Sequence, residues 1–129
     1  MNSILVVGAG KEGKGFLGET FSTDGWKVSF LDKDPKVIEA LKKGSYTVHC
    51  HQVNGSFTRI IRDYDAYLCD EAYSCMDALL DADIIGLALY PEDIPEAADY
   101  LGRGLSERAR RQGKNLTIIS ATNKNHLMK

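Results

Sequence analysis

Short apolar runs recur along this sequence and are separated by longer stretches of mixed character. Ile4–Val7 and Ile84–Leu89 are continuously apolar, which is typical of strands buried on both faces of a parallel sheet. Trp26–Leu31 predicts a second strand, because the apolar residues Trp26, Val28 and Phe30 alternate along it. Leu116–Ile119 predicts a final strand, so four strands are expected from these runs.

The stretches between the strands show apolar residues at helical spacing. In the first of them, Phe16, Leu17 and Phe21 form the expected apolar stripe. In the second, Asp34 can cap free backbone N–H groups and Pro35 fits the first helical position. The predicted helices cover Gly13–Thr23, the stretch from Asp34-Pro35 to Gly44, Glu71–Leu80, and the stretch from Tyr90-Pro91 to Lys114-Asn115.

One segment departs from this alternation. Asn54-Gly55 lies between two β-prone runs, Tyr46–Val53 and Ser56–Ile61, and this dipeptide is a strong signal for a tight hairpin turn. The whole pattern predicts an α/β fold of the Rossmann type, with a doubly wound, mostly parallel sheet, helices on both faces and an inserted β-hairpin. Its 129 residues fit a single domain, residues 1–129.

Composition narrows the possible partners. The formal net charge is −2, so the chain has no basic footprint for nucleic acid and no polybasic surface for a membrane. No apolar run approaches the roughly 20 residues of a membrane span. Residues 1–7 run directly into a strand without a basic region, so we expect no secretory signal and a cytoplasmic protein.

The three cysteines are odd in number and form no CxxC pair, which favours reduced thiols. His49 and His51 flank Cys50, but in a strand residues 49 and 51 share one face while 50 points to the other. No further ligand cluster accompanies them, so we expect no metal site.

The glycine-rich turn after the first strand carries the main chemical signal. Gly8 allows a tight turn, Gly10 lets a pyrophosphate approach the backbone, and Gly13 lets the helix pack close to the strand. The helix that follows directs its unpaired N–H groups and positive dipole end towards the phosphates. We therefore expect the turn to bind a dinucleotide, and its candidate residues are Gly8, Ala9, Gly10, Lys11, Glu12 and Gly13.

An acidic residue at the end of the second strand supports this interpretation. Asp32 lies 24 positions after Gly8, close to the spacing of about 20 expected for a ribose-binding carboxylate. It would repel the 2′-phosphate of NADP, so the sequence favours NAD. Lys33 weakens that preference, because a basic neighbour can help to bind a phosphate. Lys14 could lean towards the pyrophosphate or lie in solvent, and the sequence leaves both open.

Two later strands should end at the same crevice. Leu89 and Tyr90 follow the strand at Ile84–Leu89 and could line the nicotinamide side. Asn123 follows the last strand and is a further candidate, although it could equally be a plain turn residue.

Three segments resemble the mannitol-1-phosphate 5-dehydrogenase family. Residues 8–18 are similar to the GAGxIGRGFIG-like run that opens the family, with Glu12 in place of an apolar residue and Lys14 in place of arginine. Residues 45–49 resemble an SYxVH segment, and residues 118–123 an IIACEN segment in which Thr122 replaces the glutamate. The resemblance implies an NAD-dependent oxidoreductase that moves hydride between the nicotinamide and a polyol or polyol phosphate.

The family's catalytic lysine, asparagine and histidine belong to a C-terminal helical domain that these 129 residues do not contain. The chain is therefore expected to bind NAD but to be inactive alone, with no catalytic residue of its own. A non-enzymatic NAD-sensing domain is the alternative. A methyltransferase that binds S-adenosylmethionine is a third possibility, against which the three-glycine spacing argues.

Overall fold

A five-stranded parallel sheet forms the centre of the protein. The computed structural model describes residues 2–10, 13–111 and 113–120, with residues 50–52 described by their backbone only. The strands are β1 (Ser3–Val7), β2 (Lys27–Asp32), β5 (Tyr64–Leu68), β6 (Ile84–Leu87) and β7 (Thr117–Ser120). Their order is β5-β2-β1-β6-β7, and every neighbouring pair is parallel.

Strand β1 lies at the middle of the sheet and is buried on both faces. Ile4 and Val6 point into one apolar cluster, while Leu5 and Val7 point into the other. None of the four is more than 3% exposed. The continuous apolar run therefore has the environment that its composition predicts.

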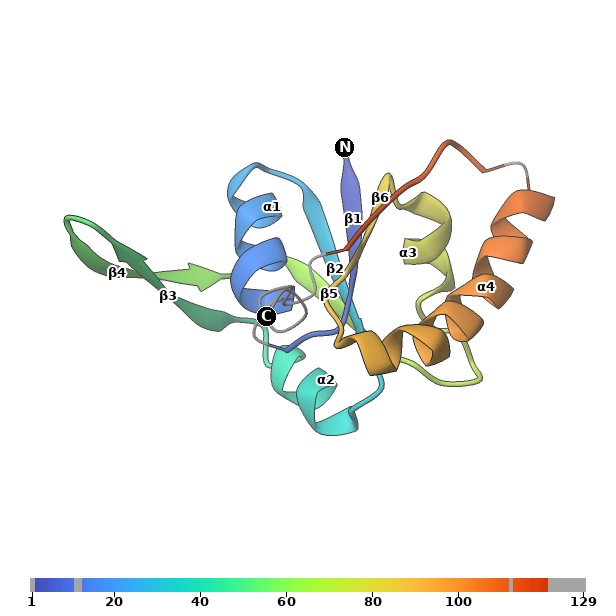
Figure 1. The fold of residues 1–129 in the computed structure, drawn as a ribbon, viewed down its shortest axis with the longest axis horizontal. Coiled ribbons are helices and arrows are strands. Elements are labelled where there is room, and N and C mark those ends of the chain that lie inside the picture. Colours follow the sequence, from blue (N-terminus) through green and yellow to red (C-terminus); the bar gives the residue numbers. More distant parts are fainter. Residues whose placement is uncertain (1, 11–12, 112, 121–129) are drawn as a thin grey trace.

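Helices cover both faces of the sheet (Figure 1). On one face, Leu17 and Ile38 pack in the cluster of Ile4 and Val6. On the other, Leu79 and Leu101 pack in the cluster of Leu5 and Val7. The helical segments are the π-helix η1 (Gly13–Gly18), α1 (Glu19–Thr23), α2 (Pro35–Leu41), α3 (Met76–Asp81), the 3₁₀ turn η2 (Pro91–Asp93) and α4 (Ile94–Arg110).

A buried arginine fixes α4 in place. Arg108 is 3% exposed, and its guanidinium donates hydrogen bonds to the carbonyl oxygens of Leu79 (2.7 Å), Lys114 (2.7 Å) and Asn115 (3.4 Å). One side chain thus connects α4 to α3 and to the segment that leads into β7.

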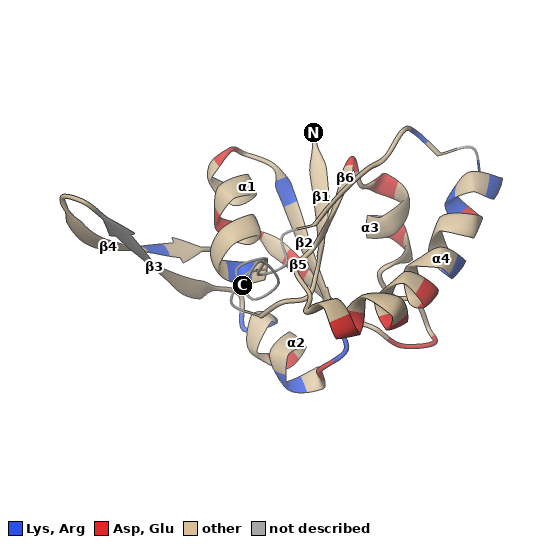
Figure 2. Cartoon of the chain, in the orientation of Figure 1, with Lys and Arg blue, Asp and Glu red and all other residues tan. Residues whose placement is uncertain are grey.

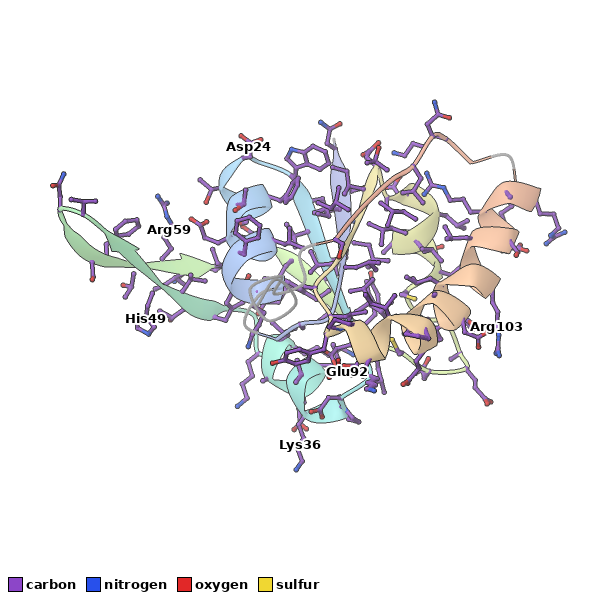
Figure 3. The ribbon with its side chains drawn as sticks, in the orientation of Figure 1. Asp24, Lys36, His49, Arg59, Glu92 and Arg103 are labelled. Carbon is purple, nitrogen blue, oxygen red and sulfur yellow. The ribbon has the colours of Figure 1, made fainter. Side chains whose placement is uncertain are left out.

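The predicted hairpin is confirmed and forms a separate two-stranded sheet. Strands β3 (Tyr46–Gln52) and β4 (Gly55–Ile61) are antiparallel, and the arm projects away from the central sheet (Figure 1). His49 and Arg59 lie along this arm (Figure 3). Arg59 forms an ion pair of 3.0 Å with Glu19 of α1, which connects the arm to the body.

Strand β5 was not predicted from the sequence. It forms the sheet edge beside β2, and its central residue Ala66 is buried while Asp65 is exposed. The polar residue in so short a run hides the apolar pattern, because an edge strand needs only one buried face. With β5 included, the parallel sheet has five strands rather than the four expected.

The helix predicted over 71–80 is wrong in its first half. Residues 71–75 are not helical, with turns on both sides of Tyr73, and the helix begins only at Met76. Tyr73 has a positive φ of 48°, its ring stacks on that of Tyr100 at 4.3 Å, and its hydroxyl donates to the Tyr100 carbonyl oxygen. A tertiary contact with α4 therefore overrides the local helical pattern.

Two other helix predictions need correction. The segment predicted as an ordinary helix over Gly13–Thr23 begins as a π-helix, and Phe16 is 56% exposed instead of lying in the buried stripe. The last helix ends at Arg110, before Lys114. By contrast, Asp34 caps α2 as predicted, since its carboxylate accepts a hydrogen bond of 2.9 Å from the Lys36 amide. None of the helices in the described ranges is long and apolar enough to cross a membrane.

Candidate functional site

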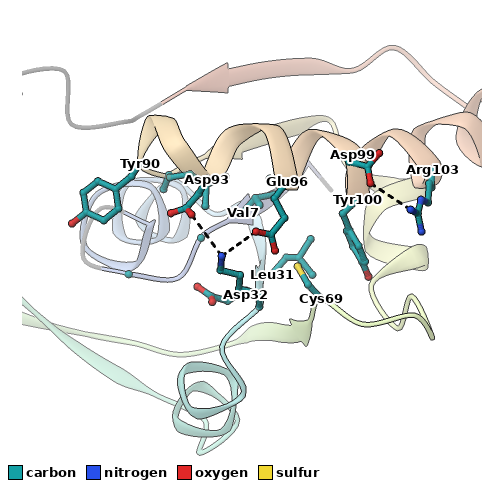
Figure 4. Close-up of a pocket in the computed structure, with 16 residues that line it drawn as sticks. Val7, Leu31, Asp32, Cys69, Tyr90, Asp93, Glu96, Asp99, Tyr100 and Arg103 are labelled. Atoms are coloured by element: carbon teal, nitrogen blue, oxygen red, sulfur yellow. Dashed lines mark hydrogen bonds and ion pairs between the residues drawn. The ribbon is translucent and has the colours of Figure 1, made fainter. Parts of the chain in front are cut away.

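The crevice lies where the sheet order changes direction. Strands β1 and β6 are neighbours, but β1 leads into η1 and α1 on one face while β6 leads into η2 and α4 on the other. The connections therefore diverge at the carboxyl ends of the two strands, which is where ligands bind in such sheets. A cavity of about 560 Å³ opens at this point (Figure 4), within the usual range of small-molecule sites.

The glycine turn forms one wall of the cavity. Gly8 has a φ of +98°, its N–H donates to the Leu31 carbonyl oxygen at 2.8 Å, and a Cβ atom there would overlap with the Ala88 carbonyl oxygen. A Cβ on Gly13 would overlap with the carbonyl oxygen of Gly8. Gly10 lines the cavity, and among the described residues no atom lies within 4 Å of a Cβ placed there. Backbone therefore takes the space at residues 8 and 13, whereas Gly10 leaves space open for a ligand.

Asp32 lies against the glycine turn. One carboxylate oxygen accepts a hydrogen bond from the Ala9 amide at 2.7 Å, and the other accepts one from the Asp34 amide at 2.9 Å. Ala9 is buried and is not among the residues that line the cavity. Its amide is used by Asp32. A carboxylate offers about four acceptor positions. The Asp32 side chain can therefore hold the turn and still accept hydrogen bonds from a ligand.

The structure brings Leu89 and Tyr90 to the same cavity. Both line it, and Tyr90 is exposed. Lys11, Glu12 and Asn123 lie outside the described residues.

The structure places the Lys14 side chain beside the hairpin. Its ammonium lies 5.7 Å from the centre of the Tyr46 ring, beside a second cavity between η1 and the hairpin. The Tyr46 hydroxyl also donates a hydrogen bond of 2.9 Å to the Lys14 carbonyl oxygen. Burial raises the pKa of Tyr46 above its usual range, so this hydroxyl keeps its proton. Lys14 thus contacts the hairpin and is not among the described residues that line the main cavity.

The opposite wall of the cavity comes from η2 and α4, and sequence reasoning did not identify it. Glu96, Tyr100 and Arg103 line the cavity from one face of α4, and Asp93 of η2 extends this row by one turn. The first half of this helix carries only acidic charges, while its second half carries three arginines and the acidic Glu107 (Figure 2). This order suits the helix dipole. The spacing of these polar residues after a strand that ends at the crevice was the available signal.

Lys33 connects the two walls. Its ammonium lies 3.2 Å from a carboxylate oxygen of Glu96 and 3.6 Å from one of Asp93 (dashed lines in Figure 4). The hydrogen bond and charge of Glu96, and then the charge of Asp93, raise the pKa of Lys33. Further along α4, Arg103 pairs with Asp99 at 3.4 Å.

The floor of the cavity includes an unreactive thiol. Burial is the main cause that raises the pKa of Cys69 to about 12, with the nearby Cys75 and carboxylates adding to it. The thiol is therefore protonated at neutral pH and is a poor nucleophile. Within the described residues, no three side chains of the metal-binding types come together, and the side chains of Cys50 and His51 are not described.

Comparison with known proteins agrees with this geometry. The family model of the mannitol dehydrogenase Rossmann domain matches residues 2–127. The mannitol-1-phosphate 5-dehydrogenase of Enterococcus faecalis is 29% identical over 95% of this chain and 32% of its own length. The enzyme of that name from Exiguobacterium sibiricum is 32% identical over 90% of this chain and 30% of its own length. The chain thus spans about a third of the length of these curated relatives.

A solved structure supports the fold independently. The TrkA-N domain of the inner membrane protein ybaL from Escherichia coli is 14% identical and superposes with a TM-score of 0.60, covering 98% of this chain and 91% of that one. At this identity the likeness concerns the fold alone, and it confirms the Rossmann-like architecture. The match to the family model over nearly the whole sequence shows that this chain belongs to the mannitol dehydrogenase Rossmann domain family.

Proposed function

We propose that this chain is the NAD-binding domain of an oxidoreductase that acts on a polyol or a polyol phosphate. The observation that carries the proposal is the glycine turn at the sheet's change of direction, with Asp32 hydrogen-bonded to it at 2.7 Å. A family of dehydrogenase Rossmann domains calls for a nucleotide cofactor. The acidic residue at the end of β2 favours NAD over NADP.

The residues of the glycine wall fit a dinucleotide. The open space at Gly10 lets a pyrophosphate lie against the backbone, near the start of the helix that begins at Gly13. Asp32 would accept hydrogen bonds from the hydroxyls of the adenosine ribose through its remaining lone pairs. The amides of Lys11 and Glu12 belong to the same proposed turn. Ala9 would act indirectly, by holding Asp32 in place.

The other end of the site would receive the nicotinamide. Leu89 and Tyr90 follow β6 and offer an apolar surface for the ring, and Asn123 is proposed to face the same region. When bound, NAD supplies the hydride acceptor of the reaction. The chain's own contribution is to orient the cofactor and to exclude water from one side of it.

The direct test compares the thermal stability of the protein with NAD, NADP and S-adenosylmethionine. A ligand that binds only the folded state raises the melting temperature by mass action. We expect NAD to give the largest shift. A larger shift with S-adenosylmethionine would contradict the proposal and favour a methyltransferase.

The ribose contact is tested by Asp32→Ala. Hydrogen bonds to a charged group contribute about 1.5–3 kcal/mol, so NAD affinity should fall about tenfold to a hundredfold, and NADP affinity should fall less. Isothermal titration calorimetry measures both constants. Asp34→Ala removes a carboxylate that caps α2 and does not line the cavity, so it is the matched control. Equal losses for NAD and NADP in Asp32→Ala would remove Asp32 from the ribose site.

Catalysis is expected to need more than these residues. We propose that the 129-residue chain binds NAD without oxidising mannitol 1-phosphate, and that it works in the cytoplasm, where thiols such as Cys69 and Cys75 stay unpaired. Absorbance at 340 nm follows NADH formation. Steady NADH production by the pure chain would contradict this expectation.

A further inference from the structure

One part of the cavity lining, here called the rim, brings the Lys33 ammonium together with the carboxylates of Asp32, Asp93 and Glu96. Arg103, which also lines the cavity, pairs with Asp99 further along α4. Lys33 follows Asp32 directly and reaches across to Glu96 (3.2 Å) and Asp93 (3.6 Å) on the opposite wall. All four residues line the cavity. Lys33 itself follows Asp32 at the end of β2, but carboxylates of η2 and α4 on the opposite wall hold its ammonium.

The position of Lys33 affects the choice between NAD and NADP, because a basic residue beside Asp32 can help to bind a phosphate. If Asp32 binds the ribose, a 2′-phosphate would lie next to it and therefore close to Lys33. An unpaired lysine there would attract the phosphate, which carries up to two negative charges. In the structure, however, two carboxylates already neutralise the ammonium, and they add negative charge to the same rim.

We propose that Asp93 and Glu96 are specificity-determining residues that make this site reject NADP. They act in two ways: they hold the Lys33 ammonium against α4, and together with Asp32 they repel a 2′-phosphate. The proposal rests on the proposed function, since it assumes that the ribose binds at Asp32. Both walls of the crevice would then select NAD over NADP, and not the Asp32 carboxylate at the end of β2 alone.

The exposure of these groups sets the size of the effect. The side chains of Lys33 and Glu96 are 58% and 67% exposed, so water and salt screen the charges. Coulomb energies at this exposure correspond to a change of about tenfold in NADP affinity when both carboxylates are neutralised. NAD lacks the 2′-phosphate but carries the anionic pyrophosphate, so its affinity should rise less than that of NADP.

The experiment measures NAD and NADP binding by calorimetry to the wild-type chain and to the double variant D93N/E96Q. We expect NADP affinity to rise about tenfold in the double variant, and the gain to shrink as salt is raised from 0.05 to 0.5 M. Adding K33M to the double variant should remove most of the gain, because the freed ammonium is then missing. A merely structural role of Asp93 and Glu96 would produce neither the salt dependence nor the dependence on Lys33.

The matched control is E92Q. Glu92 lies in the same 3₁₀ turn as Asp93, is exposed, and is not among the residues that line the cavity. Unchanged NADP affinity in D93N/E96Q, with NAD still bound, would overturn this inference and leave the proposed function standing. An equal gain in E92Q would also overturn it, by showing an effect of overall charge. Failure of the wild-type chain to bind NAD would refute the proposed function and this inference together.

Discussion

The two walls of the crevice are built in different ways. The glycine wall, formed by residues 8–10, Gly13 and the end of β2, depends on backbone atoms in close contact, and a single added carbon at Gly8 or Gly13 would overlap with a carbonyl oxygen. The α4 wall, formed by η2 and α4, presents exposed charged side chains such as Glu96. Close contacts tolerate almost no change, whereas exposed charges change binding gradually. Under the proposed function, the glycine wall would determine whether a dinucleotide fits, and the α4 wall would adjust which one is preferred.

The largest effect is expected from Gly13→Ala on the glycine wall. The new methyl group would overlap with the Gly8 carbonyl oxygen, and because this is a backbone atom the turn itself must move. We expect the free energy of unfolding to fall by about 2–3 kcal/mol and NAD binding to become undetectable. Urea denaturation and calorimetry measure the two effects.

Gly15→Ala is the control for this prediction. A Cβ on Gly15 would meet no atom within 4 Å in the described part of the chain, and alanine is the better helix former. Its stability should therefore be unchanged or slightly higher. If Gly13→Ala behaved like Gly15→Ala, the glycine wall would not depend on close contact, and the contrast between the walls would disappear.

A smaller effect is expected from Arg108→Met, which removes the support of the α4 wall. Three carbonyl oxygens lose their donor, two of them at 2.7 Å, so we expect a loss of about 2 kcal/mol in the free energy of unfolding. Arg111→Met is the control, because Arg111 is exposed and its one ion pair within residues 2–10, 13–111 and 113–120 is with Glu107, so its loss should be below about 0.5 kcal/mol. Equal losses in the two variants would show that the apolar face of α4 alone holds this wall.

The smallest effect is expected from Tyr46→Phe, which separates the glycine wall from the hairpin. The Tyr46 hydroxyl donates a hydrogen bond to the Lys14 carbonyl oxygen, and its loss should cost about 1 kcal/mol of stability. NAD affinity should change by less than about twofold, since the contacts within the turn remain.

Tyr64→Phe matches this variant, because its hydroxyl donates to the Leu41 carbonyl oxygen at 2.7 Å, away from the glycine turn. Calorimetry on both variants tests the comparison. A large loss of NAD affinity in Tyr46→Phe but not in Tyr64→Phe would show that the hairpin, and not close contact alone, positions the turn.

Local signals in the sequence predicted the parts of the fold that depend on a few neighbouring residues. Asn54-Gly55 predicted the hairpin, and Asp34-Pro35 predicted the start of α2, because each dipeptide favours its own backbone geometry. Pattern reasoning missed β5, where Asp65 interrupts the apolar run, and the turn at Tyr73, which depends on a contact with Tyr100 far along the chain. Such tertiary contacts have no local signature.

The candidate site divides in the same manner. The glycine turn and Asp32 could be found by spacing, because both follow strands with clear apolar patterns. The hydrogen bond between Asp32 and Ala9 could not be predicted, since it depends on the register of β1 against β2. The roles of Asp93 and Glu96 were not predicted, because the apolar spacing that predicts α4 gives no information about its polar face.

The hairpin has a consequence for altering this protein. Its first and last residues, Tyr46 and Ile61, are paired with each other, and neither β3 nor β4 joins the five-stranded sheet. The chain leaves the body and returns to it at one place. The arm could therefore be lengthened or shortened by two residues in each strand, so that every side chain keeps its face of the hairpin, without moving β2, β5 or the crevice. Its tip at Val53 and Asn54 is a natural attachment point for a fluorescent label.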